Sequence, residues 1–434
     1  MSESSAERRK AWLAICLAVN LGFLAAFKYH NFFIDSASIG LRAIGFDIDF
    51  AHLNWILPVG ISFYTFQCLG YSIDVYRRKI EAVRDPIVFL SFVSFFPQLV
   101  AGPVERARKL VPQFQKASEF DLVAAKQAII RILWGLFKKM VIADRVAVIV
   151  NSGYEDPSAL NEVTASLVIF LFAIQLYCDF SGYCDIAIGL ARLMGFQLTE
   201  NFRRPLISTS LQSLWKRWHV TIHTWFRDYI YCYLPRKRTG IRIAANILIM
   251  FGISGLWHGP TWNFVLWGVL NGVFLLTVDP YVFRPLSRHS SVPAKILAAV
   301  LASLLVYLSL VFFRGETWSQ SIGVLSGLGS WSFPWTDPAA AKASILVLGL
   351  AGWEVAFAAL FILLLLFVEI LQETKHRLVQ NFFRGMGYKR WAAAFVLSIT
   401  IFFFGFYDDR VGLVKLRTAP KDFDHNRDFQ YQEF

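Results

Sequence analysis

Hydrophobic residues occur along this chain in long, nearly unbroken runs that short polar stretches separate. Six runs are long enough, alone or with flanking residues, to form helices across a hydrocarbon core. They are residues 12–27, 55–73, 165–176, 296–313, 345–368 and 391–406. Backbone polar groups must be satisfied internally in lipid, and the runs lack the short alternating pattern of a membrane barrel. The pattern predicts an all-α polytopic membrane protein.

Two further apolar stretches are interrupted and predict other kinds of helix. Residues 87–100 are too short for a full span, contain Pro97 and precede Gly102, which predicts a re-entrant or broken helix. Residues 124–150 mix apolar residues with arginines and lysines. That mixture predicts an oblique helix lying partly in the membrane interface.

The polar, aromatic stretch 213–231 predicts an amphipathic helix in the interface. On a helix its apolar side chains form one stripe, namely Trp218, Ile222, Trp225 and Tyr229. His219 and His223 lie one turn apart and could ligate zinc as a pair. No glutamate follows His219 and no third ligand is near, so we expect no metal site.

Charge is sparse and unevenly placed. Lys, Arg, Asp and Glu make up 17% of the 434 residues, and the formal net charge is +12. Basic residues cluster between the hydrophobic runs, as in 77–79, 106–109 and 236–238, which is typical of cytoplasmic loops that contact anionic lipids. We expect membrane lipids and no nucleic acid as partners. Three basic residues before the first run predict a cytosolic start, and Lys28 at its end is expected to snorkel.

His258 lies in the almost wholly apolar and aromatic stretch GLWHGPTWNFVLWG, residues 255–268. An ionisable residue within a membrane segment is a functional hypothesis by default, although a histidine can also tie two helices together. Gly259 and Pro260 break a helix directly after His258, and irregular backbone at membrane depth is tolerated where it lines a cavity. A neutral imidazole in a dry cavity is a competent general base. We therefore predict that His258 is catalytic.

Two aspartates stand six residues apart in the apolar region 163–195. Asp179 and Asp185 could form a proton path or an ion site, as in a transporter. The sequence Asp179-Phe-Ser-Gly also resembles a helix break capped by Asp179 or Ser181. We favour this structural role and keep Asp179 as a candidate substrate-binding residue.

No soluble domain interrupts the hydrophobic pattern. We predict one membrane-embedded domain over 1–434, with most motifs in 54–280, further helices over 294–407 and a polar tail over 408–434. The five cysteines lack metal-knuckle or disulfide spacing. Any chemistry is therefore expected in or at the membrane.

Five motifs follow one another between residues 57 and 268. They are LPVGISFYTFQCLGYSIDVYR (57–77), FFPQLVAGPVERA (95–107), QLYCDFSGYCDIAIGLARLMGF (175–196), NFRRPLISTSLQSLWKRWHVTIHTWFRDYIY (201–231) and GLWHGPTWNFVLWG (255–268). In this order they resemble the motifs of membrane-bound O-acyltransferases, of the bacterial branch that O-acetylates polysaccharides such as alginate. Ordered agreement over several motifs is far more specific than a single match.

The resemblance implies a ring of tilted transmembrane helices, with re-entrant and interfacial helices, around a central funnel or tunnel. It implies that an acyl group, acetyl in this branch, moves from a cytosolic thioester to a hydroxyl of an exopolysaccharide or cell-envelope glycan. His258 matches the family's essential histidine and His219 a second, upstream one. Asn271 stands where many relatives have a further histidine, and His223 stands where a serine is common.

The resemblance also implies the partners of the reaction. The donor substrate would be acetyl-coenzyme A or an acyl carrier protein, with no bound cofactor, and the location a bacterial inner membrane. Because the chain has no extracytoplasmic domain to hold a polymer, we expect an acyl-accepting partner protein as well as a polysaccharide. Two alternatives stay open: D-alanyl transfer to teichoic acid from a carrier protein, and a transporter or flippase that uses Asp179 and Asp185.

Residues near the two histidines complete the predicted site. Trp257 and Asn263 are candidate substrate contacts, and Asn263 or a backbone amide near Gly259 could stabilise an oxyanion. Arg217 could meet the donor's phosphates, or lipid head groups instead.

Overall fold

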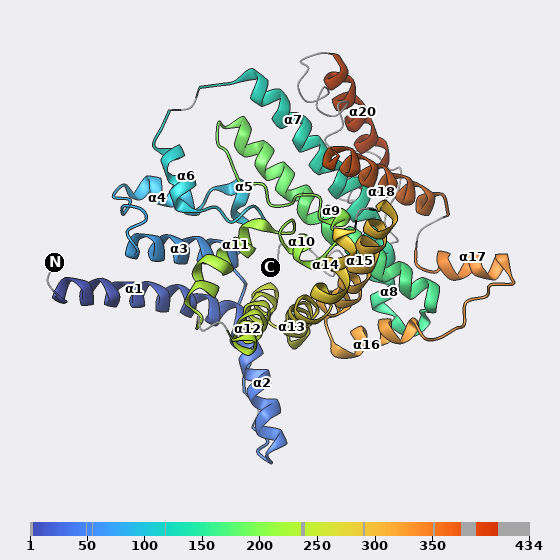
Figure 1. The fold of residues 1–434 in the computed structure, drawn as a ribbon, viewed down its shortest axis with the longest axis horizontal. Helices are drawn as coiled ribbons and strands as arrows, with labels where there is room; N and C mark the ends of the chain where they lie inside the picture. Colours follow the sequence, from blue (N-terminus) through green and yellow to red (C-terminus); the bar gives the residue numbers. More distant parts are fainter. Residues whose placement is uncertain are drawn as a thin grey trace.

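The computed structural model describes residues 3–406 except 49, 54, 118, 236–238, 290, 350–351 and 375–387. Every regular element among these residues is a helix, and they contain no β-strand, so the all-α class is confirmed. In Figure 1, α10 and α11 lie near the middle of the molecule with longer helices around them. The predicted polar tail over 408–434 and the basic loop 236–238 lie outside the described residues.

The helices differ widely in length, and several are joined end to end. The α-helices are α1 (Glu3–Leu24), α2 (His30–Ala43), α3 (Ile61–Tyr76), α4 (Pro86–Val93), α5 (Phe96–Leu99), α6 (Ala107–Phe114), α7 (Leu122–Leu136), α8 (Asp144–Glu155), α9 (Glu162–Leu193), α10 (Leu211–Trp215), α11 (Val220–Tyr229), α12 (Gly240–His258), α13 (Trp262–Thr277), α14 (Arg284–Arg288), α15 (Val292–Arg314), α16 (Trp318–Gly327), α17 (Pro338–Leu346), α18 (Gly352–Glu373) and α20 (Tyr388–Phe404). The π-helical segments are η1 (Ala25–Tyr29), η2 (Phe137–Ala143) and η6 (Asp279–Phe283), and the 3-10 turns are η3 (Pro157–Ala159), η4 (Pro205–Ile207) and η5 (Tyr231–Tyr233).

Several of these helices are long and apolar enough to cross a membrane. Among the described residues there are five, or six if the bent pair formed by α13 and Asp279–Arg288 counts as one span. They are Ala6–Ala43, Glu162–Leu193, Gly240–His258, Val292–Arg314 and Gly352–Glu373. The protein is therefore a multi-pass membrane protein, as the hydrophobic runs predict.

Two predicted segments are shorter than their apolar runs. The run 55–73 becomes helical only at Ile61, because Gly60 adopts a left-handed φ of 74°, which a helix does not allow. A Cβ at position 60 would lie 2.3 Å from the Leu99 carbonyl oxygen, so this turn requires glycine. The stretch 87–100 is divided into α4 and α5, which confirms the broken helix. Both segments form part of the protein's interior rather than simple spans, because Phe63, Phe66 and Phe92 are buried.

The predicted helix break at Asp179 is wrong. Helix α9 continues through this sequence for 32 residues from Glu162 to Leu193. The two aspartates stay helical because cations on the neighbouring segment meet them: Lys139 lies 2.7 Å from Asp179, and Lys138 lies 2.6 Å from Asp185. Ion pairs thus replace the expected capping of loop amides.

The single interfacial helix predicted over 213–231 is also wrong. The chain forms α10 and α11, and between them His219 adopts a left-handed conformation with a φ of 41°. Asn201 holds the turn, since its backbone oxygen accepts from the Val220 N–H at 2.9 Å and its side chain accepts from the Thr221 hydroxyl at 2.9 Å. The apolar side of α11 is buried in protein, where the Trp225 ring stacks on Phe66 at 4.2 Å.

Helices α7 and α9 pack at backbone contact. The stretch 124–150 runs without interruption through α7, η2 and α8, and Figure 1 shows α7 beside α9 along much of its length. A Cβ added to Gly135 would lie 2.6 Å from the Gly182 carbonyl oxygen, and one added to Gly182 would lie 2.8 Å from the Gly135 oxygen. Small residues allow such close approach of membrane helices. The contact brings Lys138 and Lys139 to the aspartates of α9.

We expect Gly135→Ala to destabilise the protein, because the new methyl group meets a backbone oxygen that cannot rotate away. Overpacking of this kind costs about 1–3 kcal/mol. The matched control is Gly22→Ala in α1, where a Cβ meets nothing within 4 Å, and where alanine favours the helix by up to about 1 kcal/mol. Thermal unfolding in detergent micelles compares the two variants. Equal midpoints for Gly135→Ala and the wild type would contradict the packing argument.

Candidate active site

The site forms where α12 ends and the chain reverses into α13. Helix α12 ends at His258, Gly259 is extended with a φ of −162°, and α13 begins at Trp262, so the predicted break is confirmed. Pro260 supplies no N–H group to continue the helix. A Cβ on Gly259 would lie 2.0 Å from the Phe264 ring, so the reversal requires glycine there.

Aromatic rings enclose His258 on several sides. Its ring centroid lies 4.7 Å from that of Trp257, 5.2 Å from that of Trp267 and 5.2 Å from that of Phe313. Only 4% of the His258 residue is exposed. An imidazole in such surroundings is held in one orientation by ring contacts, and these rings keep bulk water away from it.

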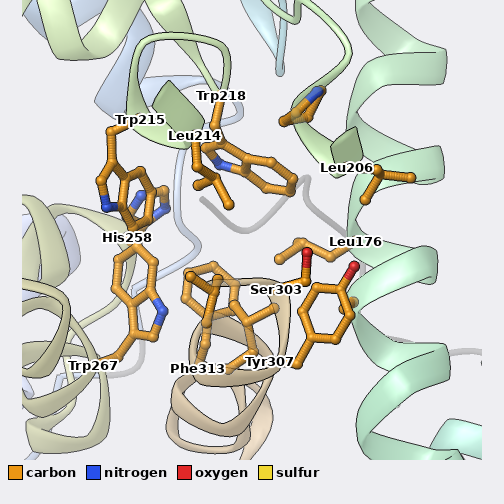
Figure 2. A pocket seen from close by; sticks show the side chains of 14 residues that line it. Leu176, Leu206, Leu214, Trp215, Trp218, His258, Trp267, Ser303, Tyr307 and Phe313 are labelled. Atoms are coloured by element: carbon orange, nitrogen blue, oxygen red, sulfur yellow. The ribbon is translucent and has the colours of Figure 1, made fainter. Parts of the chain in front are cut away.

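A narrow, mainly apolar cavity of about 30 Å³ reaches His258. Figure 2 shows His258, Trp215 and Trp267 on one side of it and Leu176, Leu206 and Tyr307 on the other. Its lining comes from α9, η4, α10 and the following turn, α12, α13 and α15: Ala173, Leu176, Pro205, Leu206, Leu214, Trp215, Trp218, His258, Trp267, Ser303, Val306, Tyr307, Leu310 and Phe313. The cavity has room for a few water molecules at most, less than the usual small-molecule site.

His219, the second predicted histidine, lies near His258 but does not line this cavity. It is fully buried between Phe180, Phe202 and Trp257, and the Trp257 ring contacts both histidines. Burial lowers the pKa of His219 well below its ordinary value, so the ring is neutral at physiological pH. A left-handed backbone at a residue other than glycine costs about 1–3 kcal/mol, and such strain concentrates at functional sites.

His223 is the other histidine of the pair that the sequence offers as possible zinc ligands. His223 packs against Trp215 with ring centroids 5.2 Å apart, and burial lowers its pKa to about 4. The part of the chain that the structure describes contains no group of three or more His, Cys, Asp or Glu side chains placed to hold a metal ion.

Three other predicted residues have protein partners. Asn263 donates from its amide nitrogen to the Gly315 carbonyl oxygen at 2.8 Å and lies 3.3 Å from the Ser321 hydroxyl. Asn263 and Asp179 are not among the residues that line the cavity, and neither is Trp257. Their predicted contacts with substrate stay predictions, while the geometry gives Asn263 a clear role in tying α13 to the turn before α16.

Arg217 lies at the edge of the cavity together with an arginine that sequence reasoning missed. Arg217 donates to the Glu373 carboxylate at 2.7 Å and Arg204 donates to it at 2.8 Å. Each arginine directly precedes a residue of the cavity lining, Trp218 and Pro205 respectively. All three charged side chains are about one-third exposed. They therefore form an accessible charged cluster, Arg204–Arg217–Glu373, beside the apolar cavity.

Lys28 does not snorkel, contrary to the sequence prediction. It lies in the π-helical segment η1 and is only 7% exposed. Its ammonium group donates to the Trp257 carbonyl oxygen at 2.7 Å and to the Ser62 hydroxyl at 3.0 Å. The side chain therefore reaches the end of α12. A lysine in an apolar run is itself a signal of function.

The chain is similar to known proteins over a region that contains most of the residues that line the cavity. Residues 52–311 match the family model of the membrane-bound O-acyltransferases, MBOAT. The chain is 38% identical to the probable alginate O-acetylase AlgI of Azotobacter vinelandii over 336 residues, which cover 74% of this chain and 64% of that protein. It is 33% identical to the peptidoglycan O-acetyltransferase of Helicobacter pylori over 347 residues, 74% of this chain and 65% of that protein.

A relative with lower sequence identity is named for a different transfer reaction. The teichoic acid D-alanyltransferase of Bacillus subtilis is 27% identical over 270 residues, which cover 58% of this chain and 67% of that protein. The chain spans less than two thirds of the length of the alginate O-acetylases that it matches, for example 64% in Azotobacter vinelandii.

We expect Asn263→Ala to lower the free energy of unfolding by about 1–3 kcal/mol, because it leaves the buried Gly315 carbonyl oxygen without its donor. Thermal unfolding in detergent measures the effect, and Gln212→Ala, at an exposed side chain, serves as control. A variant with the wild-type midpoint would refute the structural role and return Asn263 to the substrate contacts.

Proposed function

Because the chain belongs to the membrane-bound O-acyltransferase family, we propose that it transfers an acyl group from a thioester donor to a hydroxyl group of a polysaccharide. The relatives named as alginate O-acetylase and peptidoglycan O-acetyltransferase support acetyl as the acyl group and an exopolysaccharide or cell-envelope glycan as the acceptor. They also support a bacterial inner membrane as the location.

The observation that carries the proposal is the position of His258. It is the imidazole of the cavity lining, at the end of a helix and enclosed by aromatic rings. A buried base next to a narrow cavity is what transfer to a hydroxyl requires, because water would otherwise hydrolyse the thioester.

His258 acts as the general base. The acceptor oxygen attacks the carbonyl carbon of the thioester, and His258 takes the hydroxyl proton as the new C–O bond forms. When the tetrahedral intermediate collapses, the C–S bond breaks and the imidazolium returns the proton to the leaving sulfur. The products are an ester and a thiol, with no net change in protons. His219 contributes through Trp257, whose ring contacts both histidines.

The Arg204–Arg217–Glu373 cluster binds the phosphate end of the donor. Each guanidinium group contacts one oxygen of the Glu373 carboxylate, and a phosphate can replace the carboxylate because its oxygens accept the same charge-assisted hydrogen bonds. The uncharged part of the donor then extends from the cluster along the apolar cavity toward His258. Acetyl-coenzyme A and an acylated carrier protein both present a phosphate and an uncharged arm, so each fits this arrangement.

The D-alanyltransferase relative makes D-alanyl transfer from a carrier protein the second candidate. A transporter that uses Asp179 and Asp185 has less support, because both carboxylates pair with lysines and neither lines the cavity. A partner protein on the extracytoplasmic side is proposed as the carrier of the acyl group to the polymer.

We expect His258→Ala to abolish transfer while the protein still inserts and folds, because loss of a general base costs about 10²–10⁴-fold in rate. Purified protein in nanodiscs is supplied with radiolabelled acetyl-coenzyme A and cell-envelope extract, and label release and transfer are followed. His289→Ala, at an exposed histidine, is the matched control. Transfer at the wild-type rate by His258→Ala would refute the assignment of His258 as the general base. Turnover with an acylated carrier protein but not with acetyl-coenzyme A would establish the second candidate.

We expect Arg217→Gln and Arg204→Gln to raise KM for the donor with little change in kcat, and Glu373→Gln to lower KM because it frees both arginines. Each effect should weaken as salt is raised, since these side chains are partly exposed. Steady-state kinetics at two salt concentrations measure them. If Glu373→Gln and Arg217→Gln shift KM in the same direction, the phosphate role is refuted.

A further inference from the structure

The proposed reaction places negative charge on the carbonyl oxygen of the thioester, and that oxygen needs a hydrogen-bond donor. Such donors are usually the largest single contribution to catalysis of acyl transfer. The two donors that the sequence suggests are already used. The Asn263 amide bonds Gly315, and the Gly259 N–H points back to the Gly255 carbonyl oxygen at 3.4 Å.

The indole of Trp267 is a donor without an acceptor. Trp267 is only 4% exposed, and its Nε1–H has no partner among the residues that the structure describes. Indole nitrogen can donate but not accept, and buried indoles normally find a partner. A buried polar group left unpaired is costly, so the lack of an acceptor here calls for an explanation.

Trp267 also stands where a hydrogen-bond donor is needed. It lines the cavity, and its ring lies 5.2 Å from that of His258 at an interplanar angle of 89°. Figure 2 shows the nitrogen of Trp267 on the side of its ring that faces the cavity. Trp257 and Trp215 have unpaired indole N–H groups as well. Trp257 does not line the cavity, and Trp215 lines it but packs its ring against His223 and Phe251. Proximity to the base and access to the cavity coincide at Trp267.

The surroundings hold the Trp267 ring in place before any substrate binds. Its ring packs edge-on against Phe313 with centroids 4.9 Å apart. One turn later, the Asn271 amide donates to the Trp267 carbonyl oxygen at 2.8 Å and lies 3.0 Å from the Ser309 hydroxyl of α15. A donor fixed in this way stabilises developing charge without reorganisation during the reaction.

We propose that Trp267 is a catalytic residue whose indole N–H binds the carbonyl oxygen of the acyl thioester and stabilises the oxyanion, an inference that rests on the proposed function. As the acceptor oxygen attacks, the C=O π electrons move onto this oxygen, and His258 takes the hydroxyl proton. The N–H···O bond strengthens as the charge grows. When the C=O bond reforms, the C–S bond breaks and the sulfur takes the proton from His258.

The test replaces Trp267 by 3-benzothienylalanine, in which sulfur takes the place of the N–H group and the ring shape is kept. The matched control is the same replacement at Trp225, which is also buried but donates to the Phe66 carbonyl oxygen at 3.0 Å. Trp267→Phe is the second variant. Each protein is assayed for acetyl-coenzyme A turnover, for thermal unfolding, and for binding of two analogues: one with a methylene group in place of the thioester sulfur, which keeps the carbonyl, and S-ethyl-coenzyme A, which lacks it.

With 3-benzothienylalanine at position 267 we expect kcat to fall about 10²–10³-fold with an unchanged unfolding midpoint, because the ring shape is kept and no protein hydrogen bond is lost. Trp267→Phe should lower kcat similarly but also lower the midpoint, because it removes ring volume. Preference for the carbonyl-containing analogue over S-ethyl-coenzyme A should disappear. At position 225 the midpoint should fall while kcat stays within twofold of the wild type. A position-267 protein that keeps the wild-type kcat and analogue preference would overturn the proposal, and an inactive His258→Ala protein in the same assay would leave the proposed function intact. Parallel loss of stability and activity in the 3-benzothienylalanine variant at 267 would also overturn it, in favour of a packing role.

Discussion

Close contact between α12 and α13 is the constraint on which the site depends. A Cβ added to Gly255 would lie 2.2 Å from the Phe264 carbonyl oxygen, and one added to Gly268 would lie 2.2 Å from the Phe251 oxygen. The two backbones touch, so a side chain at either position would force the helices apart. This contact sets His258 on one helix against Trp267 on the other. The reversal at Gly259 and the ring cage around the imidazole follow from it.

Charge inside the protein is organised by a second pair of helices. The segment α7–η2 supplies cations and α9 supplies carboxylates, so that Asp185 meets both Lys138 and Arg131. Removing one partner of such a buried pair costs about 3–5 kcal/mol, because it leaves a charge without compensation. The network lies beside the cavity rather than in it. It fixes the wall that α9 contributes and leaves the reactive surface to rings and hydroxyls.

Hydropathy was enough to predict the helical class, the multi-pass character and the break after His258, because these depend on local composition and on proline and glycine. Local sequence patterns failed at Asp179 and at His219, where the outcome depends on residues far away in the chain. Lys139 keeps Asp179 helical, and Asn201 holds His219 in a left-handed turn. The cavity was equally out of reach: Tyr307 and Phe313 line it, yet they lie beyond the last recognisable motif. The sequence shows Trp267 as an apolar residue, but only the three-dimensional structure shows that its N–H group lacks an acceptor among the described residues.

The hydrogen bond from Lys28 to the Trp257 carbonyl oxygen joins residues 229 positions apart. A ribosome that adds about 5–20 residues per second makes the acceptor roughly 10–50 s after the donor. During that interval the first helix carries an ammonium group that has no carboxylate partner among the described residues and that a lipid interior disfavours. The helix must therefore keep Lys28 near water or lipid head groups while the rest of the chain is made. Its final depth in the membrane is fixed late in biogenesis, when α12 arrives and the ammonium group can be enclosed.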